Sequence, residues 1–298
     1  MYRPFRFGVV TGTAESHTAW ITKARKAEDL GYSTLLVADH LSTGIAPLTA
    51  LAVAAEATTT LRIGSFVFCN DYRHPALLAK EVATLDLLSN GRFELGMGAG
   101  NWPSDYEQMG VPFEKAGTRV GRLIETLHIM KKLFTEEIVN FTGKYYTITG
   151  MKGLPKPIQL PNPPIYIGSS GQRMLTAAAL EANIISIMPR GTTKGIDPTD
   201  ATPEAMAQKM SWVREAAGAR FAQLEFSSAS LHIMITDGQA PPQANKLHGP
   251  AMARVPMTVE QAIEHLLDQR EREGVSYVQV LDTQLEAFAP VVARLAGK

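Results

Sequence analysis

Cysteine is nearly missing from this 298-residue sequence, since Cys69 is the only one and no disulfide can form within the chain. A reducing compartment is the simpler explanation for a chain without disulfides. An excess of either charge is missing too, because 29 Lys+Arg and 29 Asp+Glu give a formal net charge of +0. A general nucleic-acid binder needs a concentrated basic surface, so we expect no nucleic-acid partner.

Long apolar runs are also lacking, and none approaches the roughly 20 residues of a membrane-spanning helix. The N-terminal MYRPFRF has no basic segment followed by an apolar stretch and a cleavage site. We find no metal-ligand spacing, no Walker-type phosphate loop and no G-x-S-x-G motif. These absences predict a soluble cytoplasmic protein with a small-molecule substrate and with neither a membrane nor a metal partner.

The sequence does contain eight short apolar runs, most of them followed by a helix-like stretch. They are residues 5–11, 34–38, 62–69, 93–98, 165–167, 184–188, 231–235 and 277–281. A strand buried on both faces is typically one continuous apolar run, and strands that alternate with helices indicate a parallel sheet. Eight such units in a chain of this length predict an α/β fold, a (β/α)₈ TIM barrel forming one domain over residues 1–298.

Helix-start signals and irregular segments complete this expectation. Capping or first-turn residues that predict helix starts are Ser16, Pro75, Thr202 and Thr258. A β-like stretch around Gly143 and a proline-rich run predict a hairpin and an extended connector over residues 139–162. Residues 189–201 and 237–256 lack periodicity after predicted strands, so we expect long loops that are candidate lids on the catalytic face.

In a barrel of this kind the chemistry lies where the strands end and the loops begin. Asp39 and His40 follow the second run. A histidine there can exchange a proton near neutral pH, and the neighbouring carboxylate could orient it or bind polar groups of a ligand. The alternative is a histidine that is hydrogen-bonded to the loop backbone.

The third run is interrupted by Gly64 and Ser65, a pattern that often marks a bulge or a close backbone approach. Cys69, at the end of this run, is expected to be a buried small hydrophobic residue without a nucleophilic role. Asn70 follows it and could hydrogen-bond the edge of a flat heterocycle.

The fourth run ends in the small residues Gly98, Ala99, Gly100 and Asn101. Side chains of this size would let a planar ring approach the backbone closely. Trp102 and Tyr106 could then form walls of a pocket, or they could simply cover the rim of the barrel.

The fifth run leads into a helix through Gly168, Ser169, Ser170 and Gly171. Free N–H groups and the positive end of the helix dipole would favour a phosphate at this turn. An ordinary strand-to-helix turn with a serine N-cap has the same sequence pattern, so both interpretations stay open.

Taken together, these stretches resemble the luciferase-like flavin or deazaflavin oxidoreductase family. The segments that carry the resemblance are ADH at 38–40, LRIGS at 61–65, YRHPALLAK at 72–80, ATLD at 83–86, SNGRFELGMGAG at 89–100, LPKP at 154–157 and PPIYIG at 163–168. Within this family the chain is most similar to actinobacterial members that are predicted to use the deazaflavin coenzyme F-420.

The resemblance implies an enzyme that moves a hydride between reduced F-420 and a small organic substrate at the barrel mouth. His40 would lie beside the reactive edge of the ring as proton donor or acceptor, and Asp39 would support the ring. A non-proline cis peptide at Phe66–Val67 would press on one ring face. The tail phosphate would rest on residues 168–171.

The resemblance also leaves matters open. Candidate cationic contacts to an anionic tail are Arg190, Lys194 and Arg254. Many deazaflavin-using relatives carry an acid where this chain has Asn101.

One alternative function is a monooxygenase that uses FMNH2 and oxygen, and another is a non-catalytic flavin-binding barrel. Relatives are often dimers, so we expect a homodimer.

Overall fold

A computed structural model of the chain describes residues 3–41, 44–192, 195–229, 233–236 and 255–298. The structure divides into two compact units. The first consists of Met1–Thr11, Thr22–Leu36 and Gly168–Lys298, and the second consists of Gly12–Ile21 and Val37–Ile167. No helix within the described residues is long and apolar enough to cross a membrane.

The main sheet is the predicted parallel barrel. Its strands are β1 (Arg6–Thr11), β2 (Thr34–Val37), β3 (Arg62–Ser65), β5 (Phe93–Gly98), β8 (Ile165–Ser169), β9 (Ile184–Ile187), β12 (Glu225–Ala229) and β15 (Val275–Leu281). The order β3-β2-β1-β15-β12-β9-β8-β5 closes on itself, because β3 also pairs with β5. A two-residue strand, β4 (Phe68–Cys69), continues the third strand along β5.

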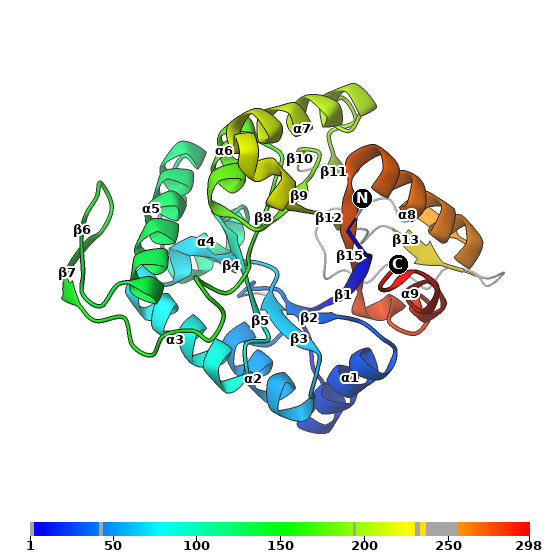
Figure 1. The fold of residues 1–298 in the computed structure, drawn as a ribbon, viewed down its shortest axis with the longest axis horizontal. Helices are drawn as coiled ribbons and strands as arrows, with labels where there is room; N and C mark the ends of the chain where they lie inside the picture. Colours follow the sequence, from blue (N-terminus) through cyan, green and yellow to red (C-terminus); the bar gives the residue numbers. More distant parts are fainter. Residues whose placement is uncertain (1–2, 42–43, 193–194, 230–232, 237–254) are drawn as a thin grey trace. The chain divides into compact units, whose positions relative to one another are not determined.

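Helices alternate with these strands along the chain, as Figure 1 shows in sequence colours. They are α1 (His17–Asp29), α2 (Pro47–Ala57), α3 (Pro75–Leu88), α4 (Pro103–Met109), α5 (Ala116–Thr135), α6 (Gln172–Glu181), α7 (Pro203–Ala217), α8 (Val259–Glu273) and α9 (Ala289–Leu295). Short 3₁₀ turns are η1 (Asn70–Tyr72), η2 (Gly218–Gln223) and η3 (Asp282–Gln284).

The predicted helix starts are confirmed, although α4 was not anticipated. Ser16 accepts a hydrogen bond from the N–H of Ala19, and Pro75 begins α3. Thr258 and Gln261 form a reciprocal capping box at the start of α8, with distances of 3.2 and 2.9 Å. Each pairing satisfies N–H groups that the first helical turn leaves without a partner.

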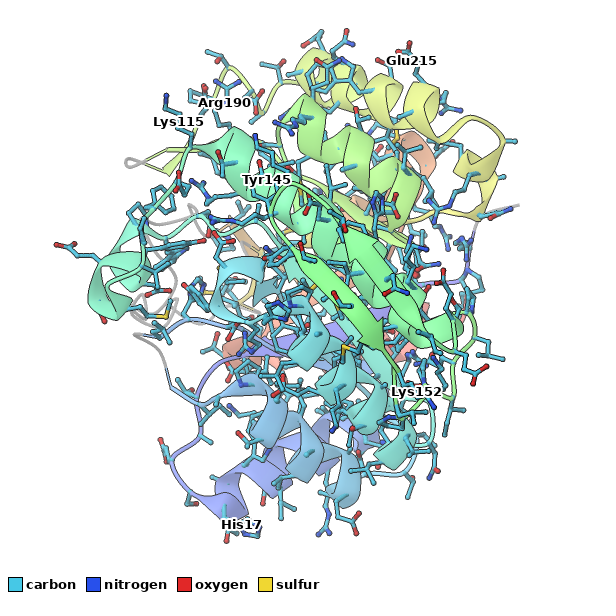
Figure 2. All side chains as sticks on the ribbon, turned by 90° about the vertical axis from the view of Figure 1, so that its left-hand side faces the viewer. His17, Lys115, Tyr145, Lys152, Arg190 and Glu215 are labelled. Atoms are coloured by element: carbon cyan, nitrogen blue, oxygen red, sulfur yellow. The ribbon has the colours of Figure 1, made fainter. Side chains whose placement is uncertain are left out.

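In the second unit, the hairpin predicted around Gly143 is confirmed as β6 (Val139–Thr142) and β7 (Thr147–Met151), which pair antiparallel beside α5 (Figure 1). Glu125 of α5 accepts hydrogen bonds from the backbone N–H groups of Lys144 and Tyr145, at 2.7 and 2.9 Å. Figure 2 labels Tyr145 at this turn. A Cβ at Gly121 would lie 2.9 Å from the Tyr145 ring, so the glycine permits this contact.

The proline-rich connector is held in an extended form by Asp86 of α3, whose side chain is fully buried. Its carboxylate accepts from the N–H of Ile158 at 2.7 Å, and from the N–H and Nε2 of Gln159 at 3.0 and 2.6 Å. These hydrogen bonds satisfy a buried charge and fix the connector to α3.

The predicted barrel strand at residues 231–235 is wrong. The barrel strand is β12, whereas β13 (Ile233–Ile235) pairs with β14 (Val255–Met257) in a separate two-stranded sheet. The sequence of β12, EFSSA, has no continuous apolar run. Buried Ser227 of this strand donates a 2.6 Å hydrogen bond to Gln279 on β15, which satisfies its hydroxyl inside the barrel. A polar pair inside the barrel therefore concealed this strand.

The loop predicted at residues 189–201 is partly structured, which corrects that expectation. It contains the antiparallel pair β10 (Gly191–Thr192) and β11 (Gly195–Ile196). Buried Lys209 of α7 donates to the carbonyl oxygens of Met188 and Asp200, at 3.0 and 3.2 Å, and so anchors both ends of the segment. Of the second predicted loop, residues 237–254 lie outside the described residues.

Candidate functional site

His40 follows β2 in the second unit, and its side chain is 28% exposed. Its Nδ1 lies 3.1 Å from Oδ2 of Asp105, a fully buried residue in the first turn of α4. The hydroxyl of Tyr72 donates to the same Oδ2 at 3.1 Å. The Trp102 ring lies over His40 with centroids 4.3 Å apart. Nδ1 of His40 is therefore paired with a carboxylate, rather than with the loop backbone.

Asp39 does not pair with His40. Its carboxylate lies against the guanidinium of Arg73, with Nη1 to Oδ2 at 2.5 Å and Nη2 to Oδ1 at 3.0 Å. Oδ2 also accepts from the backbone N–H of Cys69 at 3.0 Å. Of the two roles left open for Asp39, the orientation of His40 belongs to Asp105. The expectation that Asp39 supports a ring stays a prediction.

The third strand carries the predicted bulge. Gly64 pairs with Glu94, but Phe68 pairs with Met97, so four steps on the third strand match three steps on β5. The peptide bond Phe66–Val67 within the bulge is cis, as the family resemblance implied. The Phe66 ring lies 5.3 Å from that of Tyr166.

Glycines of β5 make room for this bulge. A Cβ at Gly96 would lie 2.0 Å from the carbonyl oxygen of Ser65. At Gly98, a Cβ would lie 2.7 Å from a methyl group of Val67. The close backbone approach that Gly64 and Ser65 indicated is therefore present, and the glycines opposite permit it.

A polar network extends from Cys69 at the end of β4. Its Sγ lies 3.4 Å from the hydroxyl of Tyr106, which donates to Oδ2 of Asp71 at 3.0 Å. Arg122 donates to the same oxygen at 2.8 Å. Burial raises the pKa of the Cys69 thiol, and it raises the pKa of the Tyr106 hydroxyl as well. Both groups therefore stay protonated at neutral pH.

Cys69 is expected to resist alkylation in the folded protein. Its side chain is buried and its thiol is protonated, whereas alkylation requires an accessible thiolate. Iodoacetamide at neutral pH should modify the native chain at least about 100-fold more slowly than the urea-unfolded chain. Mass spectrometry gives a direct readout, because Cys69 is the only cysteine. Equal rates in both states would contradict this burial.

Tyr106, in the segment after β5, is fully buried against Tyr72 and Phe113. Its role as a pocket wall stays a prediction. Trp102 is half-buried over His40, while Asn101 is exposed. The segment also includes Ala99, whose carbonyl oxygen accepts from buried Arg119 of α5 at 3.2 Å.

Gly100 has φ +79°, and a Cβ there would lie 1.9 Å from the hydroxyl oxygen of Tyr106. The small residue is therefore required by the packing of Tyr106, a reason that the sequence pattern alone did not reveal. Whether Gly98, Ala99 and Gly100 also lie against a planar ring stays a prediction.

In the first unit, the predicted phosphate turn joins β8 to α6. Gly171 occupies the N-cap without a side-chain cap, and its N–H donates to Oγ of Ser169 at 3.3 Å. The serine N-cap of the ordinary-turn interpretation is therefore not formed. The role of Gly168, Ser169, Ser170 and Gly171 in phosphate binding stays a prediction.

Arg190 has a 66% exposed side chain whose guanidinium lies 3.9 Å from Asp200, and its backbone N–H donates to Oδ2 of Asp200 at 2.6 Å. The other cationic candidates, Lys194 and Arg254, lie outside the described residues.

Two residues that the sequence reasoning missed are Asp105 and Arg73. Asp105 stands 65 positions after His40. The local sequence indicates only that an acidic residue lies in the first turn of a helix that follows a strand. Arg73 lies within the family-like segment 72–80, but nothing in its spacing predicts a pair with Asp39.

Comparison with known proteins agrees with this architecture. The family model described as Luciferase-like monooxygenase matches residues 1–275. The F420-dependent glucose-6-phosphate dehydrogenase of Amycolatopsis mediterranei is 34% identical over 156 residues, which are 50% of this chain and 46% of that protein. The chain spans less than two thirds of the length of these curated relatives, for example 62%, 46% and 29%.

Solved structures share the fold at low sequence identity. The coenzyme F420-dependent tetrahydromethanopterin reductase of Methanopyrus kandleri matches with a TM-score of 0.78 at 18% identity, over 98% of this chain and 99% of that chain. The oxygenating constituent of 3,6-diketocamphane monooxygenase from Pseudomonas putida, in complex with FMN, matches with a TM-score of 0.70 at 16% identity, over 98% of each chain.

The structure is a closed parallel barrel with a bulged third strand, and a histidine paired with a carboxylate follows β2. These features are those of a barrel oxidoreductase. Because the family model covers residues 1–275 of the 298, the chain belongs to the luciferase-like monooxygenase family of oxidoreductases.

Proposed function

We propose that this protein is an oxidoreductase that transfers a hydride between the deazaflavin coenzyme F-420 and a small organic substrate. The observation that carries the proposal is the His40–Asp105 pair, an imidazole held by a buried carboxylate at the carboxyl end of a barrel strand. Such a pair is suited to move a proton while a redox cofactor moves the hydride.

Asn70, which directly follows β4, has a side chain that would suit the edge of a flat heterocycle. Oδ1 of Asn70 is buried and has no hydrogen-bond partner among the described residues, while Nδ2 of the same side chain donates to Asp71 at 3.3 Å. A buried acceptor without a partner costs about 1–3 kcal/mol. A ring imide N–H, which flavins and deazaflavins both carry, would satisfy this oxygen. The ring would therefore be held by Asn70.

The choice of cofactor rests on the comparisons. The relative in Amycolatopsis mediterranei is named F420-dependent, and so is the reductase of Methanopyrus kandleri, which supports F-420 for this chain. The diketocamphane monooxygenase structure contains FMN, which favours the second candidate, an FMNH2- and oxygen-dependent monooxygenase. A flavin-binding barrel without catalysis is the third candidate, and the proton-exchanging pair at His40 argues against it.

F-420, when bound, would supply or accept a hydride at its ring. The protein's own task is the proton. As a substrate hydroxyl becomes a carbonyl, its carbon gives up the hydride and its oxygen gives up a proton, which His40 accepts. In the opposite direction His40 returns the proton to that oxygen. Asp39 and Arg73 hold the chain after β2 and β4, so that His40 and Asn70 keep their positions.

Titration of the purified protein with each cofactor tests this proposal. We expect F-420 to bind at least about tenfold more tightly than FMN, because the proposed function requires the deazaflavin. Asn70→Leu removes the buried acceptor and should weaken F-420 binding by about tenfold or more. Asn183→Ala, at an exposed turn of the first unit, serves as the matched control and should bind like the unchanged protein.

Two results would separate the candidates. Tight binding of reduced FMN without measurable binding of F-420 would replace the first candidate by the monooxygenase. Binding of F-420 that Asn70→Leu leaves unchanged would remove Asn70 from the ring site without touching the choice of cofactor.

A further inference from the structure

Oδ2 of Asp105 receives two neighbours from different parts of the second unit. Nδ1 of His40 lies 3.1 Å from it, and the Tyr72 hydroxyl donates to it at 3.1 Å. The Asp105 side chain has no exposed surface. An ionised carboxylate accepts hydrogen bonds and donates none. A hydrogen bond between this oxygen and Nδ1 therefore requires the hydrogen to be on Nδ1.

From this arrangement we propose that Asp105 is a positioning residue that keeps the proton of neutral His40 on Nδ1. Nε2 is then the nitrogen that exchanges a proton with the substrate. The destination of that proton rests on the proposed function, whereas the tautomer rests on the geometry alone.

Tyr72 is the fixed donor at the far side of this chain of hydrogen bonds. Burial raises the pKa of its hydroxyl, and the nearby Cys69 and Asp105 raise it further, so the hydroxyl keeps its proton. Tyr72 therefore stays a hydrogen-bond donor and carries no negative charge beside Oδ2. The carboxylate of Asp105 faces Nδ1, and in its ionised form it would stabilise the imidazolium that forms when Nε2 takes a proton.

Trp102 adds a steric restraint from the same short segment. Its ring is tilted by 41° over the imidazole, three positions before Asp105 in the chain. Together the two contacts limit both rotation of the imidazole about its Cβ–Cγ bond and displacement of the ring. A histidine held in one orientation presents the same nitrogen in every turnover.

Oxidation of a substrate alcohol would move one hydride and one proton. The hydride from the carbon would go to the deazaflavin that the site would hold, and the proton from the oxygen would go to Nε2 of His40. The proton on Nδ1 stays in place throughout, so His40 becomes an imidazolium paired with Asp105. In the reverse direction, Nε2 returns the proton to the oxygen and His40 becomes neutral again.

NMR of ¹⁵N-histidine-labelled protein without cofactor tests the tautomer, with His40 assigned by its loss in His40→Gln. At a pH where His40 is neutral, we expect its ¹⁵N shifts to report a protonated Nδ1 and an unprotonated Nε2. In Asp105→Leu the acceptor is gone, and the population should move toward the Nε2–H tautomer that the side chain of free histidine prefers. Neutral His40 protonated on Nε2 in the unchanged protein would overturn the inference.

Tyr72→Phe is the matched variant, because it removes another partner of Asp105 and leaves the acceptor for Nδ1. It should keep the Nδ1–H tautomer. If Asp105 only anchored α4, Asp105→Leu and Tyr72→Phe would change the tautomer population of His40 to the same extent. That result would also overturn the inference. Should Asp105→Leu fail to fold, the unchanged protein and Tyr72→Phe still decide the tautomer.

A kinetic readout separates positioning from binding. Asp105→Leu should lower kcat by about 10²–10⁴-fold while the dissociation constant of F-420 changes by less than about threefold. An equal loss in binding would assign Asp105 to the cofactor site instead. Failure of the proposed function looks different, because a protein that binds only FMN would retain the Nδ1–H tautomer without any turnover of F-420.

Discussion

His40→Ala should lower kcat by about 10²–10⁴-fold, the range that positioned proton transfer contributes in enzymes. The substitution removes the imidazole that pairs with buried Asp105 and that carries the proton in the proposed function. Its described contacts are with Asp105 and Trp102, so its loss leaves Asn70 and the bulged third strand in place. The dissociation constant of F-420 should therefore change by less than about threefold.

This experiment uses reduced and oxidised F-420 with a panel of small alcohols and ketones, and the fastest substrate of the unchanged protein sets the scale. His17→Ala is the matched control, because His17 is exposed at the start of α1 (Figure 2) and should leave kcat unchanged. Unaltered turnover in His40→Ala would exclude His40 as the proton-exchanging group. Retained binding without turnover of any panel member, even in the unchanged protein, would favour the non-catalytic binder.

Much of the barrel could be predicted because a strand buried on both faces needs apolar residues in succession. β1, β5 and β15 largely satisfy that rule, because single polar residues such as Glu94 and Gln279 only interrupt apolar runs that are still visible in the sequence. β12 does not, since Ser227 and Gln279 satisfy each other inside the barrel. A pattern of single residues records hydropathy, but it does not record that a polar residue has found a partner on another strand.

The candidate site shows the same limit. His40 was predicted from its place after a strand, and the bulge from Gly64 and Ser65 within an apolar run. The partner of His40 was not predictable, because Asp105 reaches it only through the fold of the segment after β5. The adjacent acid, Asp39, was the natural candidate by sequence, yet Arg73 and the N–H of Cys69 occupy its oxygens.

Gly100 lies in the segment after β5 that also contains Asp105 and Tyr106, and the packing of this segment depends on the small size of the glycine. Gly100→Ala is therefore expected to destabilise the protein by about 2–4 kcal/mol. One part of the cost is backbone strain, since φ at Gly100 is +79°. The larger part is steric, because the new Cβ would lie 1.9 Å from the Tyr106 hydroxyl and 3.0 Å from Sγ of Cys69. Tyr106 is fully buried and bonded to Asp71, so it cannot simply swing away.

Gly110→Ala isolates the backbone part of this cost. Gly110 ends α4 with φ +68°, and no described atom lies within 4 Å of a Cβ built there. This substitution should cost only about 1 kcal/mol, the strain of a left-handed alanine. Urea unfolding of the two variants gives the comparison.

If the larger loss in Gly100→Ala comes from a displaced Tyr106, Cys69 should also react faster with iodoacetamide in that variant, because its Sγ contacts the Tyr106 hydroxyl. Gly110→Ala should alkylate at the rate of the unchanged protein. Equal losses of stability in the two variants would mean that Tyr106 yields without cost. In that case the network from Cys69 to Asp71 would not be the rigid support of the segment that carries Asp105 to His40.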